Sequence, residues 1–238
     1  MNLSGHDFPT IEPAADSAAF ARLLNARHSC RAFKPEPVPR ATIEAILATA
    51  QRTASWNNTQ PWQVIVTTGA ATERFRDLMV ASAQAAEPPQ SDLAFPREYR
   101  GVYLHRRRAC GFQLYDAVGV QRGDRPAYAR QALRNYQLFD APHVAIVTSD
   151  EALGTYGAID CGAYVTNFMT AAQSLGVATI AQAALAVHCD KIRAHFSISR
   201  DRQVVCGISF GFADPAAPAN QYRTTRAGLD EVVRWVED

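Results

Sequence analysis

"YGAIDCGAYVTNFMTAAQSLGVATIAQ", residues 156–182, changes its hydrophobic period once along its length. Gly176 marks the change, because a helix commonly ends with glycine in a left-handed conformation. After it, residues 177–182 are rich in the β-branched side chains that favour strands. Before it, five apolar residues recur at spacings of four and three, the period of one helix face: Cys161, Val165, Phe168, Ala172 and Leu175. A helix that runs straight into a strand predicts a layered domain. The apolar stripe predicts that this helix needs a partner surface, which we expect from a second subunit.

The same two patterns recur on both sides of this stretch. Helical periodicity is clearest at 14–25, 40–51 and 71–86. Strands are predicted at 62–68, 143–149 and 203–211, which are again rich in β-branched residues. Strands that alternate with helices indicate an α/β or α+β domain whose sheet is covered on both faces.

The region 87–140 fits these patterns least. It begins with "EPPQSDLAFPREYRGVYLHRRRACGF", which contains three prolines and five arginines. Two interpretations remain open, an insertion that covers a site or an irregular surface loop.

Composition limits the classes of protein that the chain could be. Its 238 residues are 47% hydrophobic, which is enough for one large core, so we predict a single domain over 1–238. A net charge of +1 argues against a general nucleic-acid binder. The N-terminus lacks the charged and apolar regions of a signal peptide, and the longest apolar region is interrupted by polar residues. We therefore expect a cytoplasmic protein with no membrane partner.

Several common catalytic and metal-binding patterns do not occur in the sequence. It has no GxGxxG after a strand, no GxxxxGK[ST] and no GxSxG, which disfavours Rossmann, P-loop and serine-hydrolase chemistry. Its cysteines form neither a CxxC pair nor a ligand spacing with histidine, so we expect no metal site and no disulfide framework: Cys30, Cys110, Cys161, Cys189 and Cys206.

"ARHSCRAF", residues 26–33, carries the first candidate site. If this segment is extended, Arg27, Ser29 and Arg31 point the same way. Two guanidiniums and a hydroxyl on one edge suit a phosphate, whose oxygens bind guanidinium bidentately. The alternative is a solvated loop with two ordinary arginines.

Two further stretches carry candidate binding residues. In "TASWNNTQPW", residues 53–62, the amides of Asn58 and Gln60 offer both donors and acceptors, which match the edge of a pyrimidine-like ring. The alternative is a turn with local side-chain capping. In "NQYRTTRAGLDEVVRW", residues 220–235, Arg223 and Arg226 lie near the C-terminus, and by themselves they indicate no more than a surface pair.

Taken in order along the chain, these stretches resemble the nitroreductase family of FMN flavoproteins, most closely its nitroaromatic and nitrobenzoate reductases. The most specific elements are the Arg-x-Ser-x-Arg row, the Ser-x-x-Asn-x-Gln-Pro-Trp run and the late arginine after Asn220. The resemblance implies an α+β sandwich with a central, mostly antiparallel sheet flanked by helices. It also implies an intertwined homodimer with FMN at the subunit interface and NADH or NADPH as the electron donor.

By position, the resemblance places Arg27, Ser29 and Arg223 on the FMN phosphate and Arg31 nearer the ribityl chain and the C2 carbonyl. On the ring side it implies three kinds of contact: from Asn58 and Gln60 along the flavin, from Asn135 at the pyrimidine edge, and from the backbone at Ala183 and Ala184 near N5. The sequence "AQAAL" and Gln221 both depart from the family pattern, which uses a Pro-x-Gly-like turn and often a lysine at these places.

The implied function is NAD(P)H-dependent reduction of nitroaromatic compounds by ping-pong hydride transfer through flavin N5, with no catalytic side chain. Two alternatives stay open. One is other flavin chemistry of the same fold, by a reductive dehalogenase of the iodotyrosine type or a flavin-destroying enzyme, and the other is a non-enzymatic FMN carrier.

The segment 95–108 is the candidate substrate region. Five arginines and one acid, Glu98, give it a local positive charge that suits an acidic or electron-poor aromatic acceptor. We interpret 95–108 as part of a lid over the flavin, and the alternative is a solvated helix start. The wider region 87–140 is interpreted as a lid or insertion, and 220–238 as a C-terminal arm. The predicted substrate contacts are Arg97, Tyr99, Tyr103, Arg106 and Arg107.

Overall fold

A computed structural model describes residues 15–85 and 88–237 of the chain. Its centre is a four-stranded sheet in which every neighbouring pair of strands is antiparallel. The strand order is β1-β2-β4-β3, formed by β1 (Gln63–Thr67), β2 (His143–Asp150), β4 (Arg202–Gly211) and β3 (Ala178–Gln182). The predicted strands and the antiparallel α+β sheet are therefore confirmed.

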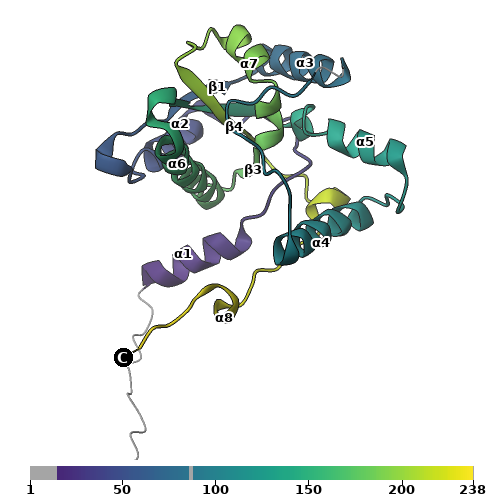
Figure 1. The fold of residues 1–238 in the computed structure, drawn as a ribbon. Helices are drawn as coiled ribbons and strands as arrows, with labels where there is room; N and C mark the ends of the chain where they lie inside the picture. Colours follow the sequence, from purple (N-terminus) through teal and green to yellow (C-terminus); the bar gives the residue numbers. More distant parts are fainter. Residues whose placement is uncertain (1–14, 86–87, 238) are drawn as a thin grey trace, which may run out of the picture.

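Helices cover both faces of this sheet (Figure 1). On one face lie α2 (Arg40–Ala50) and α6 (Gly154–Ser174), and on the other lie α3 (Ala70–Gln84) and α7 (Cys189–Phe196). The central strand β2 alternates between them, since Val147 packs toward α2 and α6 whereas Ile146 packs toward α3 and α7. Both side chains are fully buried, which explains why this strand reads as a continuous apolar run.

The apolar stripe of α6 belongs to the core of its own chain. Cys161, Phe168 and Ala172 are fully buried against the sheet, while Leu175 at the end of the helix is 45% exposed. The prediction that this stripe needs a partner surface was therefore wrong, because the chain's own sheet covers it. Gly176 ends the helix as predicted, with φ +73° and with the Val177 N–H donating to the Ala172 carbonyl at 2.9 Å.

The region 87–140 is more regular than the sequence predicted. It contains α4 (Gly101–Ala117) and α5 (Arg125–Leu133). Helix α4 buries none of its residues, so its sequence has no apolar stripe from which the helix could be predicted. The short helices α1 (Ala15–Ala26) and α8 (Leu229–Val232) lie below the sheet layers in Figure 1, with the C-terminal segment beside them. Residue 14 and residues 86–87, at the edges of predicted elements, lie outside the described part.

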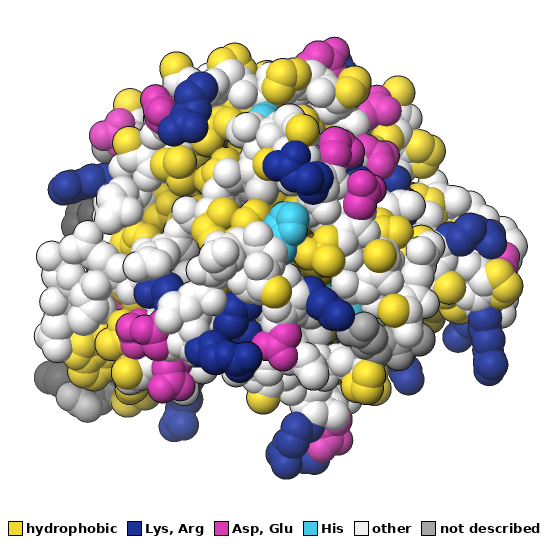
Figure 2. All heavy atoms as spheres, turned by 90° about the horizontal axis from the view of Figure 1, so that it is seen from above, with side chains coloured by type: hydrophobic (Ala, Val, Ile, Leu, Met, Phe, Trp, Pro, Cys, Tyr) yellow, Lys and Arg dark blue, Asp and Glu magenta, His cyan; other side chains and the backbone are white. Residues whose placement is uncertain are grey.

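Short 3-10 turns complete the fold between these elements: η1 (Trp56–Asn58), η2 (Leu138–Asp140), η3 (Glu151–Leu153), η4 (Ala183–Val187) and η5 (Pro218–Asn220). Charged side chains of both signs are scattered among apolar and neutral ones over the face seen in Figure 2. In residues 15–85 and 88–237, no helix combines the length and apolar character that a membrane crossing requires.

Candidate functional site

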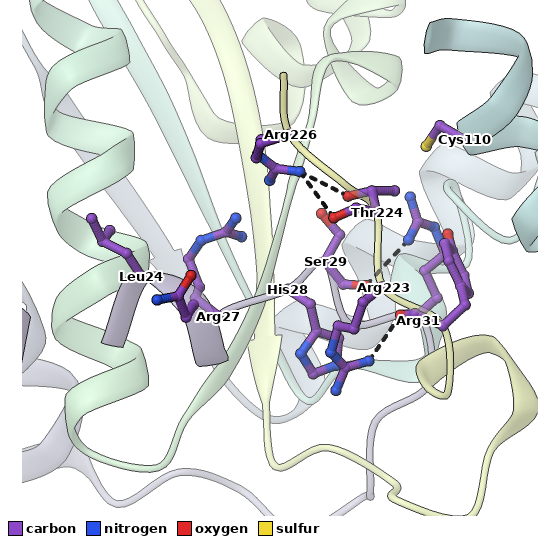
Figure 3. Close-up of a pocket in the computed structure, with 11 residues that line it drawn as sticks. Leu24, Arg27, His28, Ser29, Arg31, Cys110, Arg223, Thr224 and Arg226 are labelled. Atoms are coloured by element: carbon purple, nitrogen blue, oxygen red, sulfur yellow. Dashed lines mark hydrogen bonds between the residues drawn. The ribbon is translucent and has the colours of Figure 1, made fainter. Parts of the chain in front are cut away.

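A cavity of about 210 Å³ lies where the 27–31 row meets the segment 222–226 (Figure 3). Helix α4 borders it from a third side through Cys110. Among the described residues that line it, none is acidic and four carry guanidinium groups; the lining consists of Leu24, Asn25, Arg27, His28, Ser29, Arg31, Cys110, Tyr222, Arg223, Thr224 and Arg226. The fold thus concentrates positive charge at this one cavity although the chain is almost neutral.

The 27–31 row is extended, as the phosphate interpretation requires. Helix α1 ends at Ala26, and Ser29 then pairs with Thr179 of β3 in a parallel bridge. The Cys30 N–H donates to the Thr179 carbonyl at 3.0 Å, and the Cys30 side chain is fully buried on the inner side. Arg27, Ser29 and Arg31 therefore share the outer side, which faces the cavity.

The arginines of the cavity keep most of their donors free. Arg31 donates from Nη1 to the Ser29 carbonyl at 3.2 Å, and Arg226 donates from Nη1 to Thr224 Oγ1 at 2.9 Å. Arg223 donates from Nη1 to the carbonyls of Asn220 and Tyr222, both at 2.8 Å. Within the described part of the chain, the Nε and Nη2 groups of these three make no hydrogen bonds, which leaves them available to an anion.

The electrostatics of the cavity also indicate an anion. Burial lowers the pKa of Arg27, and the nearby charge of Arg226 lowers it further. Burial likewise lowers the pKa of His28, with additional lowering by Arg223 and by its two neighbours in the row, against a hydrogen bond to the Ala26 carbonyl that raises it. Each positive charge here disfavours the next, and a phosphate dianion would relieve that repulsion.

Tyr222 gives an independent indication that the cavity takes a polar ligand. Its hydroxyl oxygen is buried and has no hydrogen-bond partner among the described residues. Burial raises the pKa of Tyr222, so the group is a neutral donor. The guanidinium of Arg31 lies over its ring, 5.8 Å from the centroid. A ligand oxygen would satisfy the buried hydroxyl, and the cavity therefore fits a phosphate group.

The predicted ring-side residues Asn135, Ala183 and Ala184 gather at the end of β3. Gln182, the last residue of the strand, donates from Nε2 to the Asn135 carbonyl at 2.8 Å. Ala183 follows it as an exposed residue. Because the 27–31 row pairs with Thr179 of the same strand, these residues lie along one sheet edge, roughly 13 Å from Thr179 at about 3.3 Å per residue.

Asn58 and Gln60 do not reach the cavity within one chain. Their loop lies between α2 and β1, on the opposite side of the fold from α4 (Figure 1), and the Trp56 N–H fixes it to Asp160 Oδ2 of α6 at 3.1 Å. Both residues adopt positive φ values, 58° and 49°. Gln60 also uses its amide inside the loop, accepting from Gln51 Nε2 and donating to the Asn58 carbonyl, both at 3.1 Å.

The predicted substrate residues lie on and beside α4. Arg106 pairs with Glu231 of the C-terminal arm at 3.1 Å, and the Arg107 guanidinium lies 4.9 Å from the ring centroid of Tyr99. Arg97 and Tyr103 border a shallow surface hollow. Glu98, the one acid within 95–108, pairs with Arg100, and the fold brings a second acid, Glu231, to Arg106 from a distant segment.

A second cavity of about 720 Å³ lies between α4 and the arm, next to the first. Both are lined by Cys110, Thr224 and Arg226. Sequence reasoning assigned no site role to His28, Asn220 or Tyr222. His28 lies within the row itself, and Asn220 and Tyr222 come just before the predicted Arg223. Their proximity in the sequence to predicted residues was the available signal.

Comparison with known proteins agrees with this geometry. The model of the Nitroreductase family matches residues 24–212. Nitroreductase NfnB of Mycolicibacterium smegmatis is 36% identical over 232 residues, which cover 95% of this chain and 98% of the relative. Nitrobenzene nitroreductase of Ectopseudomonas oleovorans is 32% identical, with 91% and 96% covered.

A solved structure gives the same answer for the fold. The crystal structure of the FMN-dependent nitroreductase NfnB from Mycobacterium smegmatis in complex with NADPH superposes with a TM-score of 0.87 at 35% identity, covering 92% of this chain and 99% of that one. The sheet, the cationic cavity and the family match over most of the sequence agree, and the chain belongs to the nitroreductase family.

Proposed function

We propose that this protein is an FMN-dependent NAD(P)H oxidoreductase that reduces nitroaromatic compounds. The observation that carries the proposal is the cavity lined by four arginines and, among the described residues, by no carboxylate. When bound, FMN supplies two-electron transfer between a nicotinamide and an aromatic nitro group. The protein's own part is to bind, orient and enclose the reactants.

The phosphate of FMN would be held by Arg27, Ser29 and Arg223. We add Arg31, which the resemblance places nearer the ribityl chain and the C2 carbonyl, because it lines the same cavity as the other three. The three arginines contribute charge-assisted hydrogen bonds, worth roughly 1.5–3 kcal/mol each. Arg226 adds positive charge on the open side of the same cavity. The free Nε and Nη2 groups described above support this assignment.

The remainder of FMN would follow the edge of β3 toward Asn135, Ala183 and Ala184. Two facts support this direction. The row and these residues are connected by one strand, and Ala183 is exposed at its end. Backbone N–H groups there would face the flavin, and the exchange of the family's Pro-x-Gly-like turn for "AQAAL" keeps a backbone donor available.

We propose that Asn58 and Gln60 contribute to the flavin site of a second copy in a homodimer. Their separation from the cavity within one chain supports this. Large apolar side chains also remain exposed on three elements that a partner would cover: Phe20 and Leu24 on α1, Tyr156 and Ile159 on α6, and Leu229, Val232, Trp235 and Val236 in the arm. Residues 1–238 would form one domain, with the region 87–140 as lid and 220–238 as the exchanging arm.

The acceptor would be selected by the segment before and within α4. Arg97 is the best candidate for an acidic acceptor, because it has no ion-pair partner in the described residues while Arg106 is paired with Glu231. Tyr99 and Tyr103 would provide aromatic cover, and Arg107 would support it through its contact with the Tyr99 ring. In an assay of 4-nitrobenzoate against nitrobenzene, Arg97→Gln should lower the ratio of kcat/KM values, and an unchanged ratio would remove Arg97 from substrate selection.

The function is tested on the purified protein in two steps. The protein should show the visible absorption of oxidised flavin, and NADPH should bleach it anaerobically. Addition of nitrobenzene should then restore the colour, and steady-state NADPH oxidation should depend on the nitroarene. Bleaching without reoxidation by any nitroarene would favour an FMN carrier, and a colourless protein that gains no activity from added FMN would contradict the proposal.

A further inference from the structure

Asn220 lies at the junction between the two halves of the arginine cavity. It is 5% exposed, and it is the last residue of η5. Its side chain meets the 27–31 row on both of its polar atoms, because Oδ1 accepts from the Arg31 N–H at 2.7 Å and Nδ2 donates to the Ala32 carbonyl at 2.9 Å. A second donation from Nδ2 reaches the Asp214 carbonyl at 2.9 Å.

The same residue also holds the other half of the cavity. Its backbone carbonyl accepts from Arg223 Nη1 at 2.8 Å. Asn220 thereby ties together two segments almost the whole chain apart: its side chain holds the backbone of the row at Arg31, and its backbone carbonyl holds the guanidinium of Arg223. In the described residues, every hydrogen bond between 26–33 and 220–226 runs through Asn220.

Only a carboxamide satisfies these contacts. The Arg31 N–H needs an acceptor and the two carbonyls need a donor, and asparagine supplies both on one short side chain. A carboxylate would place an oxygen against the carbonyls of Ala32 and Asp214. Alanine would leave the Arg31 N–H without its acceptor, and each of the two carbonyls would lose the amide donor and keep a backbone donor, the Asp214 N–H or the Ala217 N–H.

We propose that Asn220 is a positioning residue that sets Arg31 and Arg223 in register, so that the cavity selects a phosphorylated flavin over an unphosphorylated one. This rests on the proposed FMN site. A phosphate needs donors that converge from both segments. Riboflavin has no phosphate, so its binding would not depend on how the two segments are aligned. Loss of Asn220 should therefore weaken the binding of FMN and spare that of riboflavin.

The test is the ratio of Kd values for riboflavin and FMN, measured by flavin fluorescence on flavin-free protein. Wild type should prefer FMN by about 100-fold, the equivalent of two charge-assisted contacts. Asn220→Ala should reduce this preference by about tenfold, with the Kd of riboflavin unchanged. Thr72→Val is the matched control. Thr72 lies on α3, away from the cavity, and the change removes its hydrogen bonds to the Pro142 carbonyl and to Thr67.

A double-mutant cycle separates positioning from loss of stability. Because Asn220 acts through Arg223, Asn220→Ala combined with Arg223→Ala should weaken FMN binding by less than the product of the two single effects. Asn220→Asp, which keeps the size and the acceptor for Arg31, should also reduce the FMN preference.

The Kd ratios and the double-mutant cycle decide separately on the phosphate site and on the role of Asn220. A wild-type ratio near one would overturn the phosphate site and the proposed function with it. A high wild-type ratio that Asn220→Ala or Asn220→Asp retains would overturn the role of Asn220 alone. Fully multiplicative effects in the cycle, or failure of both Asn220 variants to fold, would make Asn220 a residue of the fold only.

Discussion

Four guanidinium groups around one cavity need an anion, and the arginines at its two ends come from opposite ends of the chain. Arg27 and Arg31 could be predicted from their alternation with Ser29, because an extended backbone places all three on one side. Arg223 could be predicted only through the resemblance, since nothing in its own neighbourhood distinguishes it from a surface arginine. Asn220 and Tyr222 became visible as site residues only when burial was known.

Arg27→Ala and Arg223→Ala should each raise the Kd of FMN by roughly 10- to 100-fold, because each removes a charge-assisted contact to the phosphate. Equilibrium dialysis followed by flavin absorbance measures the occupancy. Arg40→Ala is the control, since the Arg40 side chain is 81% exposed on α2 and pairs with Glu44, away from the cavity. Full flavin occupancy in both cavity variants would contradict the assignment.

His143 makes the stability of the fold depend on pH. It is buried, its ring stacks on Phe210, Nε2 accepts from the Val38 N–H at 2.9 Å, and the Nδ1 side meets the Thr67 carbonyl at 3.2 Å. Burial lowers its pKa from 6.5, so the folded protein resists a proton that the unfolded chain accepts. Stability is therefore complete above pH 6.5 and falls below it, by up to about 1.4 kcal/mol per pH unit.

Thermal unfolding between pH 8 and pH 5 measures this effect. His143→Gln, which stays neutral, should flatten the decline below pH 6.5, and His105→Gln at an exposed position should leave it unchanged. The same steep decline in wild type and in His143→Gln would show that another group is responsible.

At the level of the elements, the strands and core helices could be predicted because each buries a regular face. Strand β2 is buried on both sides and reads as a continuous apolar run, and α6 ends at a glycine that its conformation requires. Helix α4 could not be predicted, because it buries no residue and so shows no period. The function of the α6 stripe was misread for a related reason, since a sequence shows that a face is apolar but not what covers it.

Gly176→Ala should destabilise the protein by about 1 kcal/mol, because residue 176 has φ +73° and any side chain is strained there. A Cβ at this position meets no atom within 4 Å, so the loss would come from the backbone alone. Urea unfolding gives the change in the free energy of unfolding. Gly111→Ala is the matched control: it lies inside α4 with equal space, and it should stabilise by about 0.5–1 kcal/mol. Equal effects of the two changes would contradict this explanation.

Many large apolar side chains are exposed on the surface of the single chain, as is typical of an interaction surface. Phe20 is 57% exposed, Ile159 is 58% exposed and Trp235 is 77% exposed. Trp56 and Tyr156, which are also exposed, form an aromatic pair whose ring centroids lie 4.5 Å apart. Asn58 and Gln60 belong to the same loop as Trp56, which is bonded to Asp160 of α6, and neither lines the arginine cavity of its own chain. The resemblance assigns both residues to the flavin, and their separation from the cavity would be resolved by the second chain of the proposed homodimer.

Ile159→Arg should shift the protein from dimer to monomer at micromolar concentration, because it places a charge in the proposed interface. Sedimentation velocity measures the change, and FMN should be lost together with the dimer. Ala81→Arg, which adds the same charge to the exposed side of α3, should leave both unaffected. A wild-type monomer with bound flavin and full activity would exclude the dimeric site.

The most direct test of the arginine cavity as the FMN phosphate site is reconstitution of the flavin-free protein with FMN or with riboflavin at the same concentration, followed by NADPH oxidation in the presence of nitrobenzene. The two flavins share one ring, so a difference between them reports the phosphate. Activity should return with FMN at concentrations where riboflavin leaves it at least about tenfold lower. Equal activity with the two flavins would contradict the phosphate site, and no activity with either would contradict the proposed function.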